Sequence, residues 1–361
     1  MVDRGGASWD AEGFRDRLQD VIDDHLTEMG ARLDPLGDDA VRLLAEARAS
    51  VSGGKRFRAA FCYWGYRAVE EPSSPEDERA LLRACAALEL LHASALVHDD
   101  LMDASDTRRG RLATHRGFAA RHAEEGWRGD PEQYGAAAAI LLGDLLLAWS
   151  EELLRRCGLP ADRVIAATEL FDLCRNEVIT GQFLDVSVQA RGHADVDAAM
   201  TVLRYKSAKY SIERPLQIGA ALAGASPSLL EGLSGFGLPL GEAFQLRDDL
   251  LGVFGDAATT GKPAGDDLVE GKRTVLVALT LDAAPADEAR RLDAALGTPL
   301  DAADLDRARA IIEGSGARAQ VEGVIGALVD RSLAALEATP VDDHAGVVLR
   351  ELAAAATDRA T

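Results

Sequence analysis

The chain of 361 residues carries 60 acidic and 39 basic side chains, and its formal net charge of −21 opposes general attraction to nucleic acid or anionic lipid. We therefore expect no nucleic-acid partner. The longest apolar stretch, Ala136 to Trp149, is too short to span a bilayer comfortably and is broken by Asp144, so we also expect no stable insertion into a membrane. Hydrophobic residues make up 47% of the chain but aromatic residues only 5%, which favours helices over sheets. The composition predicts an all-α protein. Because no linker-like segment divides the sequence, we also expect one domain over residues 1–361.

The first fifty residues have the pattern of one or two amphipathic helices. Apolar residues such as Phe14, Leu18 and Ile22 recur at helical spacing over residues 10–50, and Gly30 is the expected end of the first helix. The residues before this pattern lack the charged and apolar layout of a secretory signal. We therefore expect a cytoplasmic protein.

A second helix should follow Gly53-Gly54, and the loop at 72–75 separates it from a long apolar pattern at 76–103 that predicts a largely buried helix. A loop at 123–133 and a Gly-rich, charged stretch at 254–274 interrupt the rest of the chain. Further helices are expected at 134–156, 161–189, 195–223 and 228–254, with Ala-rich helices beyond 275. The four cysteines show no C-x-x-C spacing and are predicted to be buried free thiols: Cys62, Cys85, Cys157 and Cys174.

Two groups of aspartates each end an apolar helical run. Asp99 and Asp103 are four residues apart and share one helix face, so two like charges lie one turn from each other. Asp248 and Asp249 follow a second apolar run, with Gln245 and Phe244 one turn before Asp248. A solvated helix end is the simpler explanation for either group alone. Together they suggest two helices that face each other across a metal-filled cavity, and ligands that are carboxylate oxygens point to Mg²⁺.

Basic residues cluster near glycines and near the first acidic group. Lys55, Arg56 and Arg58 follow Gly53-Gly54, and Arg108-Arg109 come soon after Asp103. Two neighbouring arginines in a turn point in different directions, so each could hold a different phosphate group. Further basic residues extend the set: Lys206, Lys262, Lys272 and Arg273. Against a strongly negative background, these groups indicate a site for anions such as diphosphates.

At this point the sequence resembles the trans-isoprenyl diphosphate synthases, most closely those that make geranylgeranyl diphosphate. The matching motifs are GGKRFR at 53–58, ELLHASALVHDDLMDASDTRRG at 89–110, GQFLDV at 181–186, YKSAKYS at 205–211, and FQLRDD followed by GKPAGDDLVEGKRT. The resemblance implies a helical bundle around a deep central cavity, usually in a homodimer. It also implies a magnesium-dependent prenyltransferase that joins isopentenyl diphosphate to an allylic diphosphate and uses three Mg²⁺ ions.

The resemblance also implies a role for each matching residue. Asp99, Asp103 and Asp248 would bind Mg²⁺, while Arg108, Lys206 and Lys262 would contact the allylic diphosphate. Lys55, Arg58, His92 and Arg109 would bind isopentenyl diphosphate. Gln182, Ser207 and Gln245 would line the reaction centre, and Tyr210 and Phe244 would border the isopentenyl site.

The second acidic motif departs from the family pattern, because Gly252 stands where many members carry a third aspartate. We expect this change to weaken the metal site slightly and to leave the enzyme active, since direct metal binding is attributed mainly to Asp248.

Product length in this family depends on side chains beneath the first acidic group. Counting back from Asp99, these positions are Ala95, Ser94 and Leu91. The small Ala95 and Ser94 argue against a C15 limit, and Leu91, one turn deeper, favours a C20 product. Farnesyl and longer polyprenyl diphosphates are the alternatives.

Two other functions compete with this interpretation. A class I terpene cyclase has one diphosphate to bind, so the GGKRFR motif and the Arg108-Arg109 pair argue against it. A non-catalytic subunit of the same fold would be expected to lack ligands from one acidic group, whereas both are substantially present here.

Overall fold

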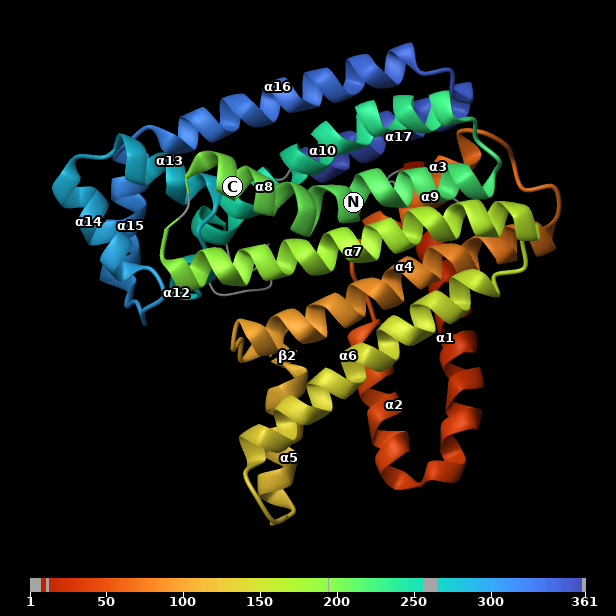
Figure 1. The fold of residues 1–361 in the computed structure, drawn as a ribbon, viewed down its shortest axis with the longest axis horizontal. Coiled ribbons are helices and arrows are strands. Elements are labelled where there is room, and N and C mark those ends of the chain that lie inside the picture. Colours follow the sequence, from red (N-terminus) through yellow and green to blue (C-terminus); the bar gives the residue numbers. More distant parts are fainter. Residues whose placement is uncertain (1–7, 11–12, 194, 256–264, 359–361) are drawn as a thin grey trace, which may run out of the picture. The chain divides into compact units, whose positions relative to one another are not determined.

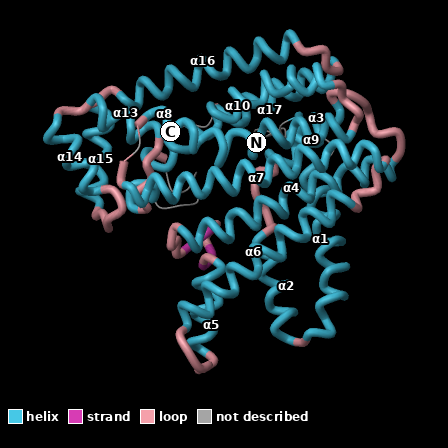
Figure 2. The backbone as a smooth tube through the Cα atoms, in the orientation of Figure 1, coloured by secondary structure: helices cyan, strands magenta, loops and turns pink. Residues whose placement is uncertain are grey.

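The computed structural model describes residues 8–10, 13–193, 195–255 and 265–358 (Figure 1). Within these residues the chain is helical apart from one two-stranded ribbon, β1 (Thr107–Arg108) with β2 (Arg111–Leu112) (Figure 2). The prediction of an all-α protein is confirmed. Lys262 lies outside the described residues.

The helices follow the chain in this order: η1 (Ser8–Asp10), α1 (Phe14–Leu33), η2 (Asp34–Leu36), α2 (Asp38–Ser50), α3 (Phe57–Arg67), α4 (Pro75–Met102), α5 (Thr114–Glu124), α6 (Pro131–Arg155), α7 (Ala161–Arg191), α8 (Val196–Leu203), η3 (Arg204–Glu213), α9 (Arg214–Leu222), α10 (Pro227–Phe254), α12 (Asp266–Val269), α13 (Val275–Ala283), α14 (Ala286–Ala295), α15 (Ala302–Gly314), α16 (Ala317–Ala338) and α17 (Asp343–Thr357).

The chain forms two compact units. Unit 1 comprises residues 1–169, 218–225 and 342–351, and unit 2 comprises residues 170–217, 226–341 and 352–361. The chain passes between them within α7, α9 and α17, so each of these helices contributes to both units. Neither unit is one continuous stretch of sequence. The single domain expected over residues 1–361 stays a prediction.

Unit 1 is organised around α4, which packs against α1, α3 and α6. The helix begins after Ser74, whose hydroxyl accepts a hydrogen bond from Asp77 N at 3.1 Å, and Pro75 fits its first turn. Its length and apolar composition would allow it to cross a membrane, but 78% of its most apolar 18-residue window is buried within the protein. This burial identifies α4 as a core helix. The four cysteines are buried and free, as predicted.

The prediction that Gly30 ends the first helix was wrong, because α1 continues to Leu33. A Cβ atom on Gly30 would lie 2.7 Å from Leu44 Cδ2 of α2. The absence of a side chain at Gly30 thus lets α1 and α2 approach closely and does not mark a helix end.

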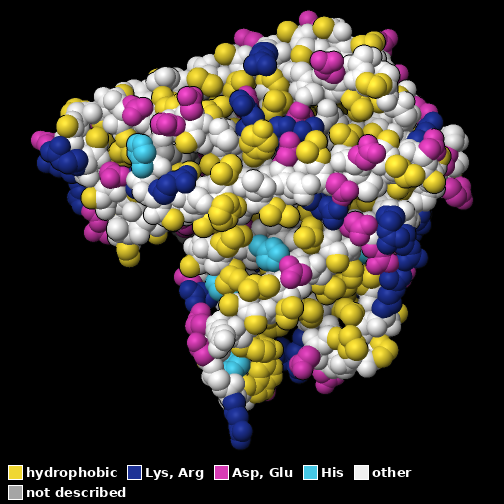
Figure 3. Space-filling model, viewed as in Figure 1, with side chains coloured by type: hydrophobic (Ala, Val, Ile, Leu, Met, Phe, Trp, Pro, Cys, Tyr) yellow, Lys and Arg dark blue, Asp and Glu magenta, His cyan; other side chains and the backbone are white. Residues whose placement is uncertain are grey.

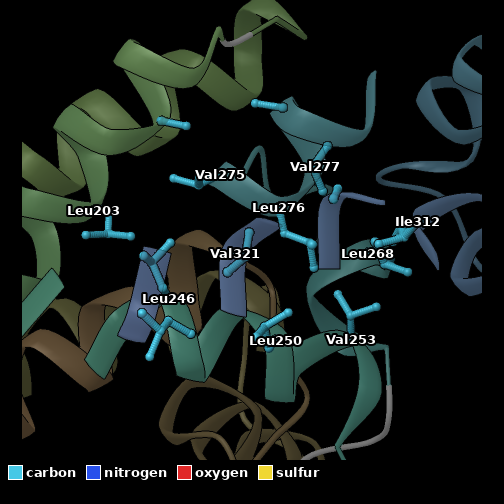
Figure 4. Close-up of a cluster of buried hydrophobic side chains, with 14 of the residues drawn as sticks. Leu203, Leu246, Leu250, Val253, Leu268, Val275, Leu276, Val277, Ile312 and Val321 are labelled. Carbon is cyan, nitrogen blue, oxygen red and sulfur yellow. The ribbon is translucent and has the colours of Figure 1, made fainter. Parts of the chain in front are cut away.

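In unit 2, α10 packs along α16 and against η3 (Figure 1). Leu246, Leu250 and Val253 project from α10 toward side chains of α13 and α16, including Leu276 and Val321 (Figure 4). These residues are almost fully buried. The core therefore fixes the end of α10 that carries the second acidic group.

Candidate active site

The first acidic group lies at the C-terminal end of α4. The last helical residue is Met102, and Asp103 caps the helix by donating its backbone N–H to Asp99 O at 2.8 Å. The C-terminal end of a helix carries partial negative charge, which disfavours carboxylates. Two aspartates one turn apart at this end therefore need compensating positive charge.

Arg108 supplies part of that charge. Its Nε donates to Asp100 Oδ1 at 2.8 Å, its Nη2 bonds the same carboxylate, and Nη2 lies 3.9 Å from Asp99 Oδ2. Asp100 is almost completely buried. Asp100 stands inside the DDLMD motif but lies off the helix face shared by Asp99 and Asp103, so the spacing of the motif predicted no role for it.

The ribbon β1–β2 sets the directions of the two adjacent arginines. Thr107 pairs with Leu112 and Arg108 with Arg111, so Arg109 and Gly110 form a two-residue turn with φ of 52° and 74°. Positive φ at both central residues is the signature of a type I′ hairpin turn. Arg108 points to Asp100, while Arg109 Nη1 donates to Ser52 O at 2.7 Å. The two guanidinium groups thus separate, as the sequence suggested.

Arg109 belongs to a cationic cluster with the Gly53–Arg58 loop, by which we mean the turn at 53–56 together with the first two residues of α3. Loss of surrounding water lowers the pKa of Arg109, and the positive charges of Arg56, Arg108 and Arg58 lower it further. Burial likewise holds the pKa of His92 well below its ordinary value, with Arg58 and Arg109 contributing. Arg58, His92 and Arg109, which we assigned to one substrate, therefore do lie near one another within unit 1, and Lys55 is in the same loop. Like charges held this close make a site that attracts anions.

The second acidic group lies near the C-terminal end of α10 in unit 2. Asp249 is buried and accepts a hydrogen bond from Gln245 Nε2 at 2.8 Å. Burial raises the pKa of Asp249 to about 8, and the nearby charges of Asp267 and Asp248 raise it too. Gln245, which the family resemblance assigned to the reaction centre, is thus bonded to Asp249. Phe244 is buried beside them on the same helix.

Asp267 of α12 also belongs to this group, and its place in the sequence did not predict this. Its Oδ1 lies 3.2 Å from Lys272 Nζ, and its carboxylate occupies the space beside Gly252, where a Cβ atom would lie 1.9 Å from Oδ2. The motif GKPAGDDLVEGKRT contains Asp267 but gave no indication of which of its acids faces α10. The carboxylate of Asp267, from α12, therefore occupies the space that a side chain at Gly252 would need.

Lys206, Ser207 and Tyr210 lie on η3, which is a π-helix of ten residues. We expected an ordinary helix over 195–223; a π-helix was not predicted, because its wider turn leaves no distinct mark on the apolar spacing. π-Helical turns occur frequently at functional sites. Lys206 Nζ lies 2.6 Å from Asp185 Oδ2 of α7, three residues after Gln182.

A buried polar network fixes η3 to α7. Glu177 accepts hydrogen bonds from Lys209 Nζ at 2.8 Å and from Arg214 Nε at 2.7 Å and Nη2 at 2.8 Å. A Cβ atom on Gly241 of α10 would lie 2.4 Å from Ala208 O of η3. The π-helix thus contacts both α7 and α10 closely.

The three positions proposed to limit product length are on α4. Leu91 and Ser94 are buried and Ala95 is half-buried. None of the three carries an aromatic side chain, so α4 itself places no large group one turn below Asp99.

Comparison with known proteins decides the family. A family model described as polyprenyl synthetase matches residues 41–313, which is most of the chain. The chain belongs to the polyprenyl synthetase family. This polyprenyl synthetase is similar to the crystal structure of geranylgeranyl pyrophosphate synthase from Corynebacterium glutamicum, complexed with isoprenyl diphosphate and magnesium. The TM-score is 0.93 and the identity 39%, over 96% of this chain and 99% of that one.

Two relatives with named activities are also similar to this chain in sequence. Geranylgeranyl diphosphate synthase of Sulfolobus acidocaldarius is 35% identical over 68% of each chain. Geranylfarnesyl diphosphate synthase of Natronomonas pharaonis is 31% identical over 72% of this polyprenyl synthetase and 76% of the relative. The chain is a chain-elongating prenyltransferase with the isoprenoid synthase helical fold.

The residues present fit a magnesium site. In the part of the chain that the structure describes, no three carboxylate, imidazole or thiol side chains converge as a preformed cage for a metal. Mg²⁺ typically uses one or two carboxylates, several waters and the phosphate oxygens of a substrate, and so needs no such cage. Each acidic group of this polyprenyl synthetase offers carboxylate oxygens in that number.

Proposed function

We propose that this prenyltransferase condenses isopentenyl diphosphate with allylic diphosphates of five to fifteen carbons and releases all-trans geranylgeranyl diphosphate. The observation that carries the C20 assignment is the absence of a bulky side chain at Ser94 and Ala95 on α4, combined with Leu91 one turn deeper. Relatives named geranylgeranyl diphosphate synthase support it. A relative named geranylfarnesyl diphosphate synthase makes C25 the second candidate.

Asp99, Asp103 and Asp248 are proposed to hold three Mg²⁺ ions together with one diphosphate. Bound Mg²⁺ would supply positive charge to the leaving diphosphate. The position of Asp99 and Asp103 at a helix C-terminus supports this role, because carboxylates there are stabilised by a cation. Arg108, Lys206 and Lys262 are proposed to contact the same diphosphate, and the first two already pair with aspartates of their own units.

Isopentenyl diphosphate is proposed to bind at the cationic cluster of unit 1: Lys55, Arg58, His92 and Arg109. Burial lowers the pKa of Arg109, and the neighbouring positive charges of Arg56, Arg108 and Arg58 lower it further. A bound diphosphate would compensate these charges, which supports this role. Of the unit 2 residues, Gln182, Ser207 and Gln245 are proposed to line the reaction centre, with Tyr210 and Phe244 beside the isopentenyl group.

The reaction follows from these roles. The C–O bond of the allylic diphosphate breaks as the basic residues stabilise the departing diphosphate, and an allylic cation remains. The double bond of isopentenyl diphosphate attacks this cation to form the new C–C bond. The released diphosphate then accepts the proton that leaves the product. Apolar residues of α4 such as Leu91 exclude water, which would otherwise convert the cation to an alcohol.

A homodimer is proposed from the exposed face of α7. In unit 2, Ile179, Phe183 and Val186 are spaced so that they share one helix face, and 69% of Phe183 is exposed. Hydrophobic side chains gather along α7 on the face shown in Figure 3. A second copy that presents the same face would cover them by two-fold symmetry. The predicted native mass is therefore twice that of the chain. We also propose a cytoplasmic location.

The experiment that separates the synthase from a cyclase measures diphosphate release from purified enzyme in Mg²⁺. A synthase releases diphosphate from geranyl diphosphate only when isopentenyl diphosphate is also present, whereas a cyclase needs the allylic substrate alone. We expect release to require both substrates, to stop with EDTA, and to fall by several orders of magnitude in Asp103→Ala. Rapid release without isopentenyl diphosphate would contradict the proposal.

A further inference from the structure

A buried ion pair joins the Gly53–Arg58 loop of unit 1 to α4. Arg56 Nη1 donates to Glu89 Oε2 at 2.8 Å, and only 4% of the Arg56 side chain and 5% of the Glu89 side chain are exposed. Removing two charges from water is unfavourable unless further hydrogen bonds stabilise both of them. The substrate and metal roles proposed above leave both residues out, so the pair needs another explanation.

The remaining hydrogen bonds of Arg56 all lead into the protein. Nη2 donates to Gln19 Oε1 of α1 at 2.5 Å and to Val51 O, just after α2, at 2.6 Å. With Glu89 on α4, one guanidinium group thus connects three helices. Its donors are directed at these internal acceptors and are not presented to a substrate.

The backbone of the loop has a conformation that needs such support. Gly53, Gly54 and Arg56 have φ of 66°, 96° and 57°. The left-handed region is readily adopted by glycine but costs energy for a residue with a side chain. Arg56 is also the residue that immediately precedes α3. Its fixed side chain therefore stabilises the turn that directs Lys55 and Arg58 on either side of it.

Glu89 connects the same turn to α4. Its second oxygen, Oε1, accepts a hydrogen bond from Ala59 N in the first turn of α3 at 3.4 Å. A carboxylate at the N-terminal end of a helix is favourable. Glu89 also lies three residues before His92 on α4, so one carboxylate sets the distance between the loop and the helix that bears His92.

Glu89 is also a negative charge within reach of the cationic cluster. Its charge raises the pKa of Arg109, in opposition to the charges of Arg56, Arg58 and Arg108. Arg109 in turn donates to Ser52 O, one residue before the loop. Without Glu89, the guanidinium groups around the loop would repel one another more strongly.

We propose that Arg56 and Glu89 are positioning residues, whose ion pair holds the Gly53–Arg58 loop in the conformation that presents Lys55 and Arg58 to a diphosphate. The identity of that diphosphate as isopentenyl diphosphate rests on the proposed function. Neither residue touches the substrate; both act through the loop.

The kinetic test uses a double variant, Arg56→Met with Glu89→Leu, because removing both charges avoids leaving one buried charge unpaired. We expect its Michaelis constant for isopentenyl diphosphate to rise about 10- to 100-fold, as for the loss of charge-assisted contacts. The Michaelis constant for the allylic substrate should change by less than about twofold. Arg56→Lys keeps the charge but loses the fork of donors, and should give an intermediate value.

The control variant is Leu26→Ala, which creates a cavity beside α1 in the same unit and leaves the hydrogen-bond partners of Arg56 and Glu89 unchanged. It should lower the melting temperature without changing either Michaelis constant. A merely structural role for Arg56 and Glu89 predicts the same behaviour for the double variant. A folded double variant with an unchanged constant for isopentenyl diphosphate would overturn the proposal.

A second readout does not depend on catalysis. Amide hydrogen exchange of peptides covering residues 52–60 should be faster in the double variant than in the parent enzyme, while peptides from α6 are unchanged. If the parent enzyme does not use isopentenyl diphosphate, the proposed function fails, and this exchange measurement still tests the positioning role. Equal exchange in parent and double variant would refute it.

Discussion

The carboxylate of Asp267 fills the space beside Gly252, at 1.9 Å from where a Cβ atom on that glycine would be. Lys272 fixes this carboxylate through a contact of 3.2 Å, so it is not free to move aside. The space beside the glycine that interrupts the second acidic motif is thus occupied by the carboxylate of an aspartate from another helix, α12. The sequence alone suggested a weakened site.

Restoring the missing acid should consequently harm the enzyme. Gly252→Asp places a carboxylate against Asp267, close to Asp248 and Asp249, and we expect it to destabilise the fold by about 1–3 kcal/mol. Turnover should fall as well. The matched control is Gly323→Asp, which adds the same side chain to α16, where nothing lies within 4 Å of the new Cβ. Chemical denaturation of both variants measures the difference in their free energies of unfolding. A Gly252→Asp protein as stable and active as the control would show that Asp267 does not exclude a side chain at position 252.

Arg108 and Arg109 should separate kinetically. Arg108 is bonded to Asp100 beside the first acidic group, while Arg109 is bonded to Ser52 O beside the Gly53–Arg58 loop. Arg108→Ala should mainly raise the Michaelis constant for the allylic diphosphate, and Arg109→Ala that for isopentenyl diphosphate, each by about 10- to 100-fold. Initial rates with each substrate varied in turn give both constants. Equal effects of both variants on both substrates would argue against this division.

The π-helix that carries Lys206 should be sensitive to one methyl group on α10. A Cβ atom at Gly241 would lie 2.4 Å from Ala208 O, so Gly241→Ala must displace η3 or α10. We expect kcat to fall by about 10-fold or more, because a shift of about 1 Å misplaces catalytic groups. Gly235→Ala, on the same helix, meets only Ala335 Cβ at 3.4 Å and should behave like the parent enzyme. Comparable rates for the two variants would mean that η3 tolerates displacement.

A buried histidine of unit 1 should make stability depend on pH. His25 of α1 lies edge-on to Trp149 of α6, and burial lowers its pKa below the ordinary value of 6.5. The charged groups near it are Glu28, Arg32, Glu152 and Arg156. Below pH 6.5 the unfolded chain takes up a proton at His25 that the folded chain does not. The contribution of His25 to the free energy of unfolding is therefore fully present above this pH and is lost as the pH decreases.

The measurement is the melting temperature between pH 7.5 and 5. We expect a smaller decrease for His25→Phe than for the parent protein, because the variant has no proton to take up at this position. His193→Gln, at an exposed position, is the control and should retain the decrease of the parent. Identical slopes for His25→Phe and the parent would assign the pH dependence to other groups.

Product length should respond to a bulky group on α4. Ser94 is buried one turn before His98 and Asp99, and it is not a proposed metal ligand. Ser94→Phe fills the space beneath the acidic group and should shift the main product from C20 toward C15. Ser94→Thr, a small change at the same position, should leave the product unchanged. An active Ser94→Phe enzyme with the same product distribution would show that the chain grows elsewhere.

The sequence was sufficient to predict the helices that carry the site, because their apolar spacing is long and uninterrupted. The helix expected at 76–103 is α4, and that expected at 228–254 is α10. Helix ends set by tertiary packing were predicted less well, as at Gly30, where close contact with Leu44 replaced the expected stop.

Side-chain partners could not be derived from spacing along one helix. The bond from Gln245 to Asp249, the pairing of Arg108 with Asp100, and the position of Asp267 all depend on how a side chain turns or on which segment of the chain lies opposite. The π-helix of η3 was missed for a related reason. It is stabilised by Glu177, which lies far from it in sequence.

The most direct test of the central claim is the size of the product made by purified enzyme. Labelled isopentenyl diphosphate would be incubated separately with C5, C10 and C15 allylic diphosphates in Mg²⁺, and the dephosphorylated products separated by chain length. We expect a labelled linear C20 product from each starter. Release of an unlabelled cyclic hydrocarbon, or no incorporation of label from any starter, would contradict it.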